Sequence, residues 1–234
     1  MQSIQEALSI TYPGRGILCG MTKDGRKAIC AYFIMGRSAN SRNRVFIADG
    51  QDVIIHPADP SKVQDPSLII YAPVRTCGET LIVTNGDQTD TIHDGLIAGK
   101  TFEQALETRC FEPDSPNFTP RISALMTFQG KYAYRLSILK CLDGKGERCG
   151  RFTYHYEPQP GEGHLIHTYL GDGNPLPSFA GDPKTVAVEG DLDAFTDAVW
   201  NALNEDNRIS LFTRTVDLAT GETESRMINR YQPV

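Results

Sequence analysis

Three arginines, Arg37, Arg42 and Arg44, lie close together in the segment MGRSANSRNR, which follows the apolar run AICAYFI. A guanidinium group is a planar fork of N–H donors that can bind two oxygens of a phosphate or carboxylate at once. The Ser and Asn residues between the arginines favour a turning loop and supply further donors. The segment therefore has the chemistry of an anion-binding loop, with a solvated loop of surface ion pairs as the alternative.

The overall composition restricts the kind of anion that such a loop would bind. The chain has 234 residues and a formal net charge of -6. Proteins that bind nucleic acids more often carry a basic excess, so we expect no nucleic-acid partner and a small, local anion site. No apolar run reaches transmembrane length and the start of the chain lacks the features of a signal peptide, so we expect a cytoplasmic protein without a membrane partner. In that compartment its cysteines should be reduced thiols.

Apolar runs joined by short glycine turns predict a chain dominated by antiparallel hairpins. Such turns occur at Asp24-Gly25, Asp49-Gly50, Gln129-Gly130 and Thr220-Gly221. Further strands are expected in LIIYAPVRTCGETLIVTNG, RFTYHYEP and HLIHTYL, whereas GDGNPLPSFAGDPK is expected to be a loop. The pattern predicts about ten to twelve strands.

Helices are predicted at fewer places. Thr101 and Gln104 form a T-x-x-Q capping box for a helix that reaches Cys110, and a shorter helix before it ends at Gly99, which places helices over 90–110. The segment DLDAFTDAVWNALN predicts a helix over 191–204. Hairpins and helices in this order do not alternate as in a parallel sheet. We therefore expect an α+β fold, two antiparallel sheets covered by helices, in a single domain over residues 1–234.

Two further motifs look functional but fail on their spacing. GLIAGKT has three residues between Gly95 and Gly99, where a phosphate-binding P-loop needs four. His164 and His167 are three residues apart on a predicted strand and so face opposite sides of the sheet. No set of Asp, Glu or Cys completes a metal site with them, and we predict no metal and no cofactor.

Polar side chains that end other apolar runs form a second group of candidates. Each alone is compatible with a turn or a stiffened loop, as at Asn85-Gly86 or around Pro116 and Pro120. The group comprises Tyr71, Arg75, Asn85, Asp87, Glu112, Asn117, Thr119 and Arg121.

Taken together, the motifs YPGRGI, GRSANSRNR, YAPVR, NGDQTD and EPDSPNFTPR resemble, in this order, those of the archaeal-type inosine monophosphate (IMP) cyclohydrolase family. The resemblance covers the first half of the chain and is looser beyond it. It implies a four-layer αββα sandwich like that of the N-terminal nucleophile hydrolases. It also implies a cytoplasmic enzyme of purine biosynthesis that closes 5-formamidoimidazole-4-carboxamide ribonucleotide (FAICAR) to IMP with loss of water.

The resemblance also implies roles for the candidate residues. Tyr71, Glu112 and Arg121 would line the reacting end, although Glu112 has a structural alternative as the ion-pair partner of Arg121. The substrate, a purine nucleotide, would be bound by Arg37, Arg42, Asn43, Arg44, Arg75, Asn85, Asp87, Asn117 and Thr119. Ring closure within one molecule requires a near-attack geometry and stabilisation of a developing oxyanion, and neither requires a metal.

Two other functions remain open at this point. One is a purine nucleotide-binding protein without catalysis, and the other is an amide hydrolase of the related fold. The chain starts Met1-Gln2, so removal of Met1 exposes no Ser, Thr or Cys, and hydrolysis by an N-terminal nucleophile is not expected. Whether copies of the chain form a homo-oligomer is also open.

Overall fold

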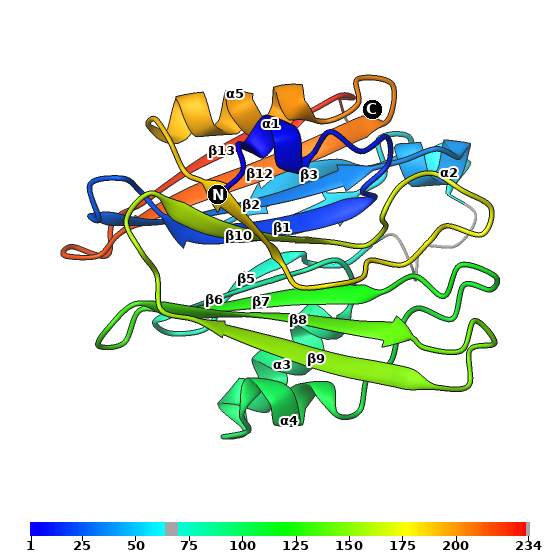
Figure 1. The fold of residues 1–234 in the computed structure, drawn as a ribbon, viewed down its shortest axis with the longest axis horizontal. Helices are drawn as coiled ribbons and strands as arrows, with labels where there is room; N and C mark the ends of the chain where they lie inside the picture. Colours follow the sequence, from blue (N-terminus) through cyan, green and yellow to red (C-terminus); the bar gives the residue numbers. More distant parts are fainter. Residues whose placement is uncertain (64–69, 233–234) are drawn as a thin grey trace.

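The computed structural model describes residues 1–63 and 70–232, which form two stacked antiparallel sheets with helices on the outside (Figure 1). The first sheet has the strand order β11-β10-β1-β2-β12-β13. Its strands are β1 (Arg15–Met21), β2 (Lys27–Met35), β10 (Glu162–His167), β11 (Lys184–Ala187), β12 (Arg208–Asp217) and β13 (Thr223–Asn229). The α+β class and the antiparallel sheets that the sequence predicts are confirmed.

The second sheet runs in sequence order from β3 to β9. Its strands are β3 (Val45–Asp49), β4 (Asp52–His56), β5 (Val74–Thr76), β6 (Thr80–Thr84), β7 (Arg121–Thr127), β8 (Ala133–Cys141) and β9 (Cys149–Tyr156). Because each strand pairs with its neighbour in the chain, tight hairpins build most of this sheet.

Helices cover the outer face of each sheet (Figure 1). Helices α1 (Ile4–Ala7) and α5 (Leu192–Ala202) lie on the first sheet, and α3 (Gln88–Ile97) and α4 (Phe102–Leu106) lie on the second. Two single turns, α2 (Ala39–Arg42) and η1 (Pro60–Lys62), lie in loops. In the part of the chain that is described, no helix is long and apolar enough to cross a membrane.

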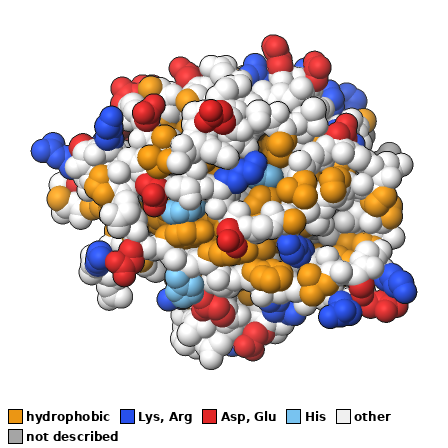
Figure 2. Space-filling model, viewed as in Figure 1, with side chains coloured by type: hydrophobic (Ala, Val, Ile, Leu, Met, Phe, Trp, Pro, Cys, Tyr) orange, Lys and Arg blue, Asp and Glu red, His pale blue; other side chains and the backbone are white. Residues whose placement is uncertain are grey.

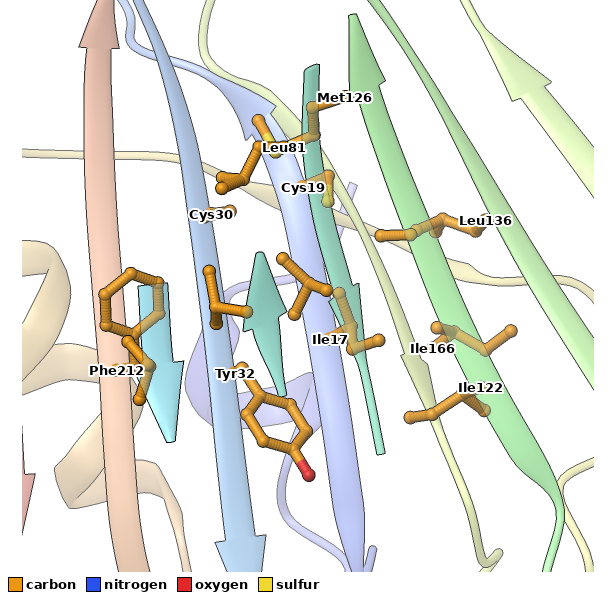
Figure 3. Close-up of a cluster of buried hydrophobic side chains, with 14 of the residues drawn as sticks. Ile17, Cys19, Cys30, Tyr32, Leu81, Ile122, Met126, Leu136, Ile166 and Phe212 are labelled. Atoms are coloured by element: carbon orange, nitrogen blue, oxygen red, sulfur yellow. The ribbon is translucent and has the colours of Figure 1, made fainter. Parts of the chain in front are cut away.

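Three apolar clusters lie between the four layers. The central cluster joins the two sheets, and Figure 3 shows Ile17 and Tyr32 of the first sheet with Ile122 and Leu136 of the second. The outer clusters lie under α5 and under α3 and α4. Central strands are therefore buried on both faces, and β12 shows this with eight consecutive buried residues.

The predicted hairpin turns are confirmed. Gly25, Gly50, Gly130 and Gly221 all have positive φ, between 60° and 75°, and each lies in the turn that joins consecutive strands. The described residues contain thirteen strands rather than ten to twelve. One strand that the sequence did not predict is β11, which begins at Lys184, the last residue of a predicted loop, and adds an edge to β10.

The helix predictions need two corrections. The capping box of Thr101 and Gln104 is present, but its helix ends at Leu106 instead of reaching Cys110. The arginine-rich segment is not a loop throughout, because Ser38 and Ser41 cap each other and start the helical turn α2. The helix predicted over 191–204 is present as α5, with Asp191 as its N-cap.

Candidate active site

A hollow of about 340 Å³ opens at one end of the sandwich, where β1 begins at Arg15 and β2 ends at Met35. Three arginines line it, Arg15, Arg37 and Arg44, against one carboxylate, that of Asp114. On the face that Figure 2 shows, basic side chains lie among acidic ones. The local cationic excess of this hollow in an acidic chain therefore suits a small anionic ligand. We call it the arginine hollow.

Two arginines of the predicted cluster line the arginine hollow. Arg44 is buried, and its Nε donates to the Ser41 carbonyl at 2.9 Å. Arg37 is more exposed, pairs with Asp172 and places its guanidinium carbon 5.0 Å from the ring centroid of Tyr12. Gly36 allows the segment to fold back, since a Cβ there would lie 2.6 Å from the Ser41 carbonyl oxygen.

Two residues between Arg37 and Arg44, namely Arg42 and Asn43, point away from the arginine hollow. Arg42 donates from Nη2 to Asn207 Oδ1 at 3.1 Å. The Asn43 side chain donates from Nδ2 to the Asp59 carbonyl at 2.8 Å and accepts from Asp59 N–H through Oδ1 at 2.7 Å. Both residues line a separate hollow, so the helical turn α2 divides the predicted cluster between two sites.

Behind the wall of the arginine hollow, Arg15 forms a two-point ion pair with Glu112, at 3.1 and 3.2 Å. The two side chains are only 11% and 8% exposed. Burial alone would lower the pKa of Arg15, but Glu112 and the nearby hydroxyls of Tyr71, Tyr169 and Tyr32 hold it well above its usual value. Burial raises the pKa of Glu112 despite the opposing charges of Arg15 and Arg121. A carboxyl group of this kind can exchange protons closer to neutral pH than an exposed one.

A pair of tyrosine hydroxyls lies beside this ion pair. The Tyr32 and Tyr71 hydroxyl oxygens are 3.0 Å apart, and both side chains are buried. Burial raises the pKa of Tyr32 well above its usual value. Burial also raises the pKa of Tyr169 to about 12, and the Tyr169 hydroxyl is hydrogen-bonded to that of Thr119. The hydroxyls of Tyr32 and Tyr169 therefore stay protonated at neutral pH, and the hydroxyls of this group can donate to an oxygen that gains negative charge.

A second set of predicted residues supports the ion pair from behind. Arg121 donates from Nη1 to Asp87 at 2.7 Å and to Gln88 at 2.8 Å. The Asn85 side chain is fully buried and holds the backbone of β7, accepting from Ile122 N–H at 2.8 Å. The alternative of Glu112 as the ion-pair partner of Arg121 is wrong, because Glu112 pairs with Arg15 and Arg121 with Asp87.

The loop between Glu112 and β7 supplies the remaining wall. Asn117 and Thr119 both line the arginine hollow. The Asn117 side chain accepts from Leu176 N–H at 3.0 Å, and Thr119 N–H donates to Asp114 Oδ1 at 2.6 Å. Phe118 between them adopts a φ of 44°, which is strained for a non-glycine residue and shows how tightly this loop is held.

The structure thus separates the predicted residues into three groups. Arg37, Arg44, Asn117 and Thr119 line the arginine hollow. The group behind it comprises Tyr71, Asn85, Asp87, Glu112 and Arg121. The third group, away from it, comprises Arg42, Asn43 and Arg75, of which Arg75 pairs with Asp90 at 2.8 Å.

Among the residues that received no role from the sequence, four carry most of the geometry of this region. They are Arg15, Tyr32, Asp114 and Tyr169. Arg15 lies in the motif YPGRGI, and an arginine directly after Pro13-Gly14 at the start of an apolar run is a usable signal. Tyr32 carries no such signal, because it lies inside an apolar run.

The two histidines singled out in the sequence do face opposite sides of β10. His164 Nδ1 lies 2.6 Å from the Tyr134 hydroxyl of the other sheet, whereas His167 donates from Nδ1 to the Tyr169 carbonyl at 2.9 Å. Among the described residues, no three His, Cys, Asp or Glu side chains gather in a way that could hold a metal ion.

Comparison with known proteins identifies relatives of this chain. Residues 12–222 match the model of a family described as IMP cyclohydrolase-like protein. A curated IMP cyclohydrolase of Methanopyrus kandleri is 32% identical over 177 residues, which are 71% of this chain and 79% of that protein. An IMP cyclohydrolase of Methanocaldococcus jannaschii is 30% identical over 150 residues, 61% of this chain and 73% of that protein.

Proposed function

The chain belongs to the IMP cyclohydrolase-like family, and we propose that it is an IMP cyclohydrolase that closes FAICAR to IMP with loss of water in purine biosynthesis. The observation that carries this proposal is the arginine hollow with the Arg15–Glu112 pair behind it. A nucleotide monophosphate needs a local cationic site, and ring closure needs proton transfer at a water-poor end of the same site.

We place the phosphate of the substrate at the open side of the arginine hollow. Arg37 and Arg44 come from the same segment and both line this side. Arg37 is the more exposed of the two, so it can exchange Asp172 for a phosphate. The two residues thereby share the work of phosphate binding, with Arg44 as the fixed cation and Arg37 as the adjustable one.

The reacting end then points inwards, past Arg15. The carboxamide nitrogen attacks the formyl carbon, loses a proton and forms a ring that carries a hydroxyl group. A carboxamide N–H is a very weak acid, so its proton leaves as the C–N bond forms, and Glu112 accepts it. Arg15 holds the carboxylate in position, and its own charge, together with Arg121, stabilises the ionised form.

Loss of water completes the reaction. The formyl oxygen gains negative charge during attack and must later be protonated in order to leave. Tyr71 is suited to donate to this oxygen, because its partner Tyr32 can supply a proton in turn along the 3.0 Å contact. The oxygen thus takes one proton from Tyr71 on ring closure and a second, the one that Glu112 removed, as it leaves as water. The former formamido nitrogen loses its N–H proton as the C=N bond forms, and this proton restores the tyrosine pair, so the cycle returns both acid and base to their starting forms.

The proposal also includes a fold like that of the N-terminal nucleophile hydrolases and a single domain over the whole chain. The order of helix, sheet, sheet and helix supports a likeness to the N-terminal nucleophile hydrolases, and the central cluster shared by both sheets supports a single domain. We also propose a cytoplasmic protein with a nucleotide substrate and no nucleic-acid partner. Superposition on a solved N-terminal nucleophile hydrolase tests the fold, because the chain direction of every central strand must agree.

Turnover of FAICAR by the purified protein tests the function. The absorbance change on IMP formation measures it, and the assay is run with and without EDTA to remove divalent metal ions. We expect Glu112→Gln to lower kcat by about a hundredfold or more while nucleotide binding persists. Tyr71→Phe should lower kcat by about tenfold to a thousandfold. Arg42→Ala, which points to a different hollow, is the matched control.

Three outcomes would contradict the proposal. Tight nucleotide binding without turnover by the wild-type protein favours the non-catalytic binding protein. Cleavage to a new N-terminal Ser, Thr or Cys favours an amide hydrolase. Near-normal turnover of both the Glu112 and the Tyr71 variants removes the assignment of proton transfer and leaves substrate positioning as the source of the rate.

A further inference from the structure

A second hollow, of about 440 Å³, lies at the opposite end of the layer between the sheets. It is lined by Val216, which pairs with Ala28 at the start of β2, whereas the arginine hollow is lined by Met35 at the end of that strand. Seven residues of strand correspond to about 23 Å. The two hollows are therefore separate sites.

One charged side chain, that of Arg214, lines this hollow from inside the sandwich. Arg214 follows Phe212 by two residues on β12, so it points to the same face as Phe212, which belongs to the central cluster (Figure 3). Its residue is only 5% exposed, and its guanidinium carbon lies 5.1 Å from the Phe212 ring centroid. An arginine is rarely placed in such an apolar layer unless its charge is compensated.

Arg214 lacks that compensation within the described residues. Its one hydrogen bond there runs from Nε to the Ser225 hydroxyl at 2.9 Å, and no carboxylate forms an ion pair with it. Burial lowers the pKa of Arg214, and the Cys30 thiol and the Asp52 carboxylate offset this only in part. Asp52 itself binds Thr76 N–H at 2.8 Å. The outer part of the guanidinium fork is thus available to a ligand.

A second polar group in the hollow, the Thr76 hydroxyl, has no hydrogen-bond partner among the described residues. It is buried and lines the same hollow as Arg214. Leaving such a group unpaired costs about 1–3 kcal/mol, so structures normally satisfy it. An unsatisfied hydroxyl beside an arginine that has no ion-pair partner in the described part of the chain points to a missing acceptor.

The remaining lining sets the chemical class of that acceptor. Leu81, Phe128 and Val216 provide an apolar wall, and the exposed Glu79 and Glu222 also line the hollow. A single arginine beside two carboxylates suits a group with one negative charge better than a doubly charged phosphate. The volume lies within the range of sites for small organic molecules.

We propose that this hollow binds a small organic carboxylate, whose carboxylate group pairs with Arg214 and accepts a hydrogen bond from Thr76. Its apolar body packs against Leu81, Phe128 and Val216. An amine on the ligand is accommodated by Glu79 or Glu222. The site is independent of the cyclohydrolase activity, which is carried at the other end of the molecule.

Titration of the purified protein with benzoate tests this site. NMR chemical shifts of the Arg214 Nε–H and the Val216 amide report the binding. We expect saturable binding with a dissociation constant of about 1 mM or lower. Benzamide, which has the same shape without the charge, should bind at least about tenfold more weakly, and so should benzoate to Arg214→Gln. Arg226→Gln is the control and should leave affinity unchanged, because this half-buried arginine on neighbouring β13 pairs with Asp193 and does not line the hollow.

Thr76→Val provides a second variant, which keeps the test decisive if Arg214→Gln does not fold. It should weaken benzoate binding by about threefold to tenfold. Shifts confined to the arginine hollow, an unchanged affinity in Thr76→Val, or a dissociation constant above about 10 mM would overturn the proposal. Stronger binding of inorganic phosphate than of benzoate would overturn the choice of a carboxylate.

Discussion

Arg15, whose side chain is 11% exposed, and the buried Arg214 lie on strands of the same sheet at opposite ends of the molecule, but only Arg15 has a carboxylate partner among the described residues. At the arginine hollow, Glu112 compensates the charge from within the chain. At the second hollow, where Arg214 lies and which we call the far hollow, the compensation must come from solvent or from a ligand. The Arg15 charge at the arginine hollow is therefore paired before a ligand binds, whereas the hollow at Arg214 needs a ligand to complete the pairing.

The same substitution at both arginines gives the largest contrast. Arg15→Met leaves the Glu112 carboxylate buried without a partner, and we expect the free energy of unfolding to fall by about 3–5 kcal/mol. Urea denaturation at pH 7 measures this. The double variant Arg15→Met/Glu112→Gln should recover part of the loss, because it removes the stranded charge. A loss below about 1 kcal/mol in Arg15→Met would show that Glu112 needs no partner.

Acid should destabilise the protein in part through His167, which lies beside the start of β1 at the end of the arginine hollow. Burial lowers the pKa of His167 to about 3, so this histidine stays neutral in the folded protein while its unfolded form takes up a proton below about pH 6.5. Its contribution to stability is therefore present above pH 6.5 and is lost as the pH falls towards the folded value. Between pH 6 and pH 4 we expect a loss of about 2–3 kcal/mol.

Urea denaturation of the wild type and of His167→Gln at a series of pH values measures this contribution. The variant should show a flatter dependence between pH 6 and pH 5, above the range in which most carboxylates titrate. Arg214 stays protonated throughout and should add no slope. Equal slopes in the two proteins would mean that His167 takes up a proton in the folded state.

Nucleotide affinity compares two neighbours in one segment. Arg37 lines the arginine hollow and Arg42 does not. Arg37→Ala should weaken binding of IMP by about tenfold, or about 1.4 kcal/mol, because a charge-assisted contact is lost. Arg42→Ala should leave the affinity within about a factor of two. Calorimetric titration with IMP decides, and equal effects of the two variants would contradict the placement of the phosphate.

The smallest effect is expected at the far hollow in the absence of ligand. Arg214→Met removes a buried charge that has no ion-pair partner among the described residues, and Met fills a similar volume. We expect the free energy of unfolding to change by less than about 1 kcal/mol in either direction. Thermal unfolding of Arg214→Met and of Arg15→Met, each measured against the wild type, compares the two losses of stability. A loss as large as that of Arg15→Met would show that Arg214 is a structural residue.

Features that depend on neighbouring residues were predictable from the sequence. The glycine turns at Gly25 and Gly221, the cap at Asp191 and the capping box at Thr101 follow from local backbone preferences. The turn α2 was missed because a Ser38–Ser41 capping box is shorter and less distinctive than one with Glu or Gln. In the region of Tyr71, the first two residues of the predicted strand, Leu68 and Ile69, lie outside the described residues.

The sequence by itself determined which segments carry charge and where the chain turns, because both are properties of a few adjacent residues. Tertiary structure alone decided that Arg15 meets Glu112, 97 positions away, and that Tyr32 meets Tyr71. It also decided that Arg214 points inwards. Both faces of β12 are covered in a sandwich of four layers, so the strand has no polar–apolar alternation from which the direction of one arginine could be read.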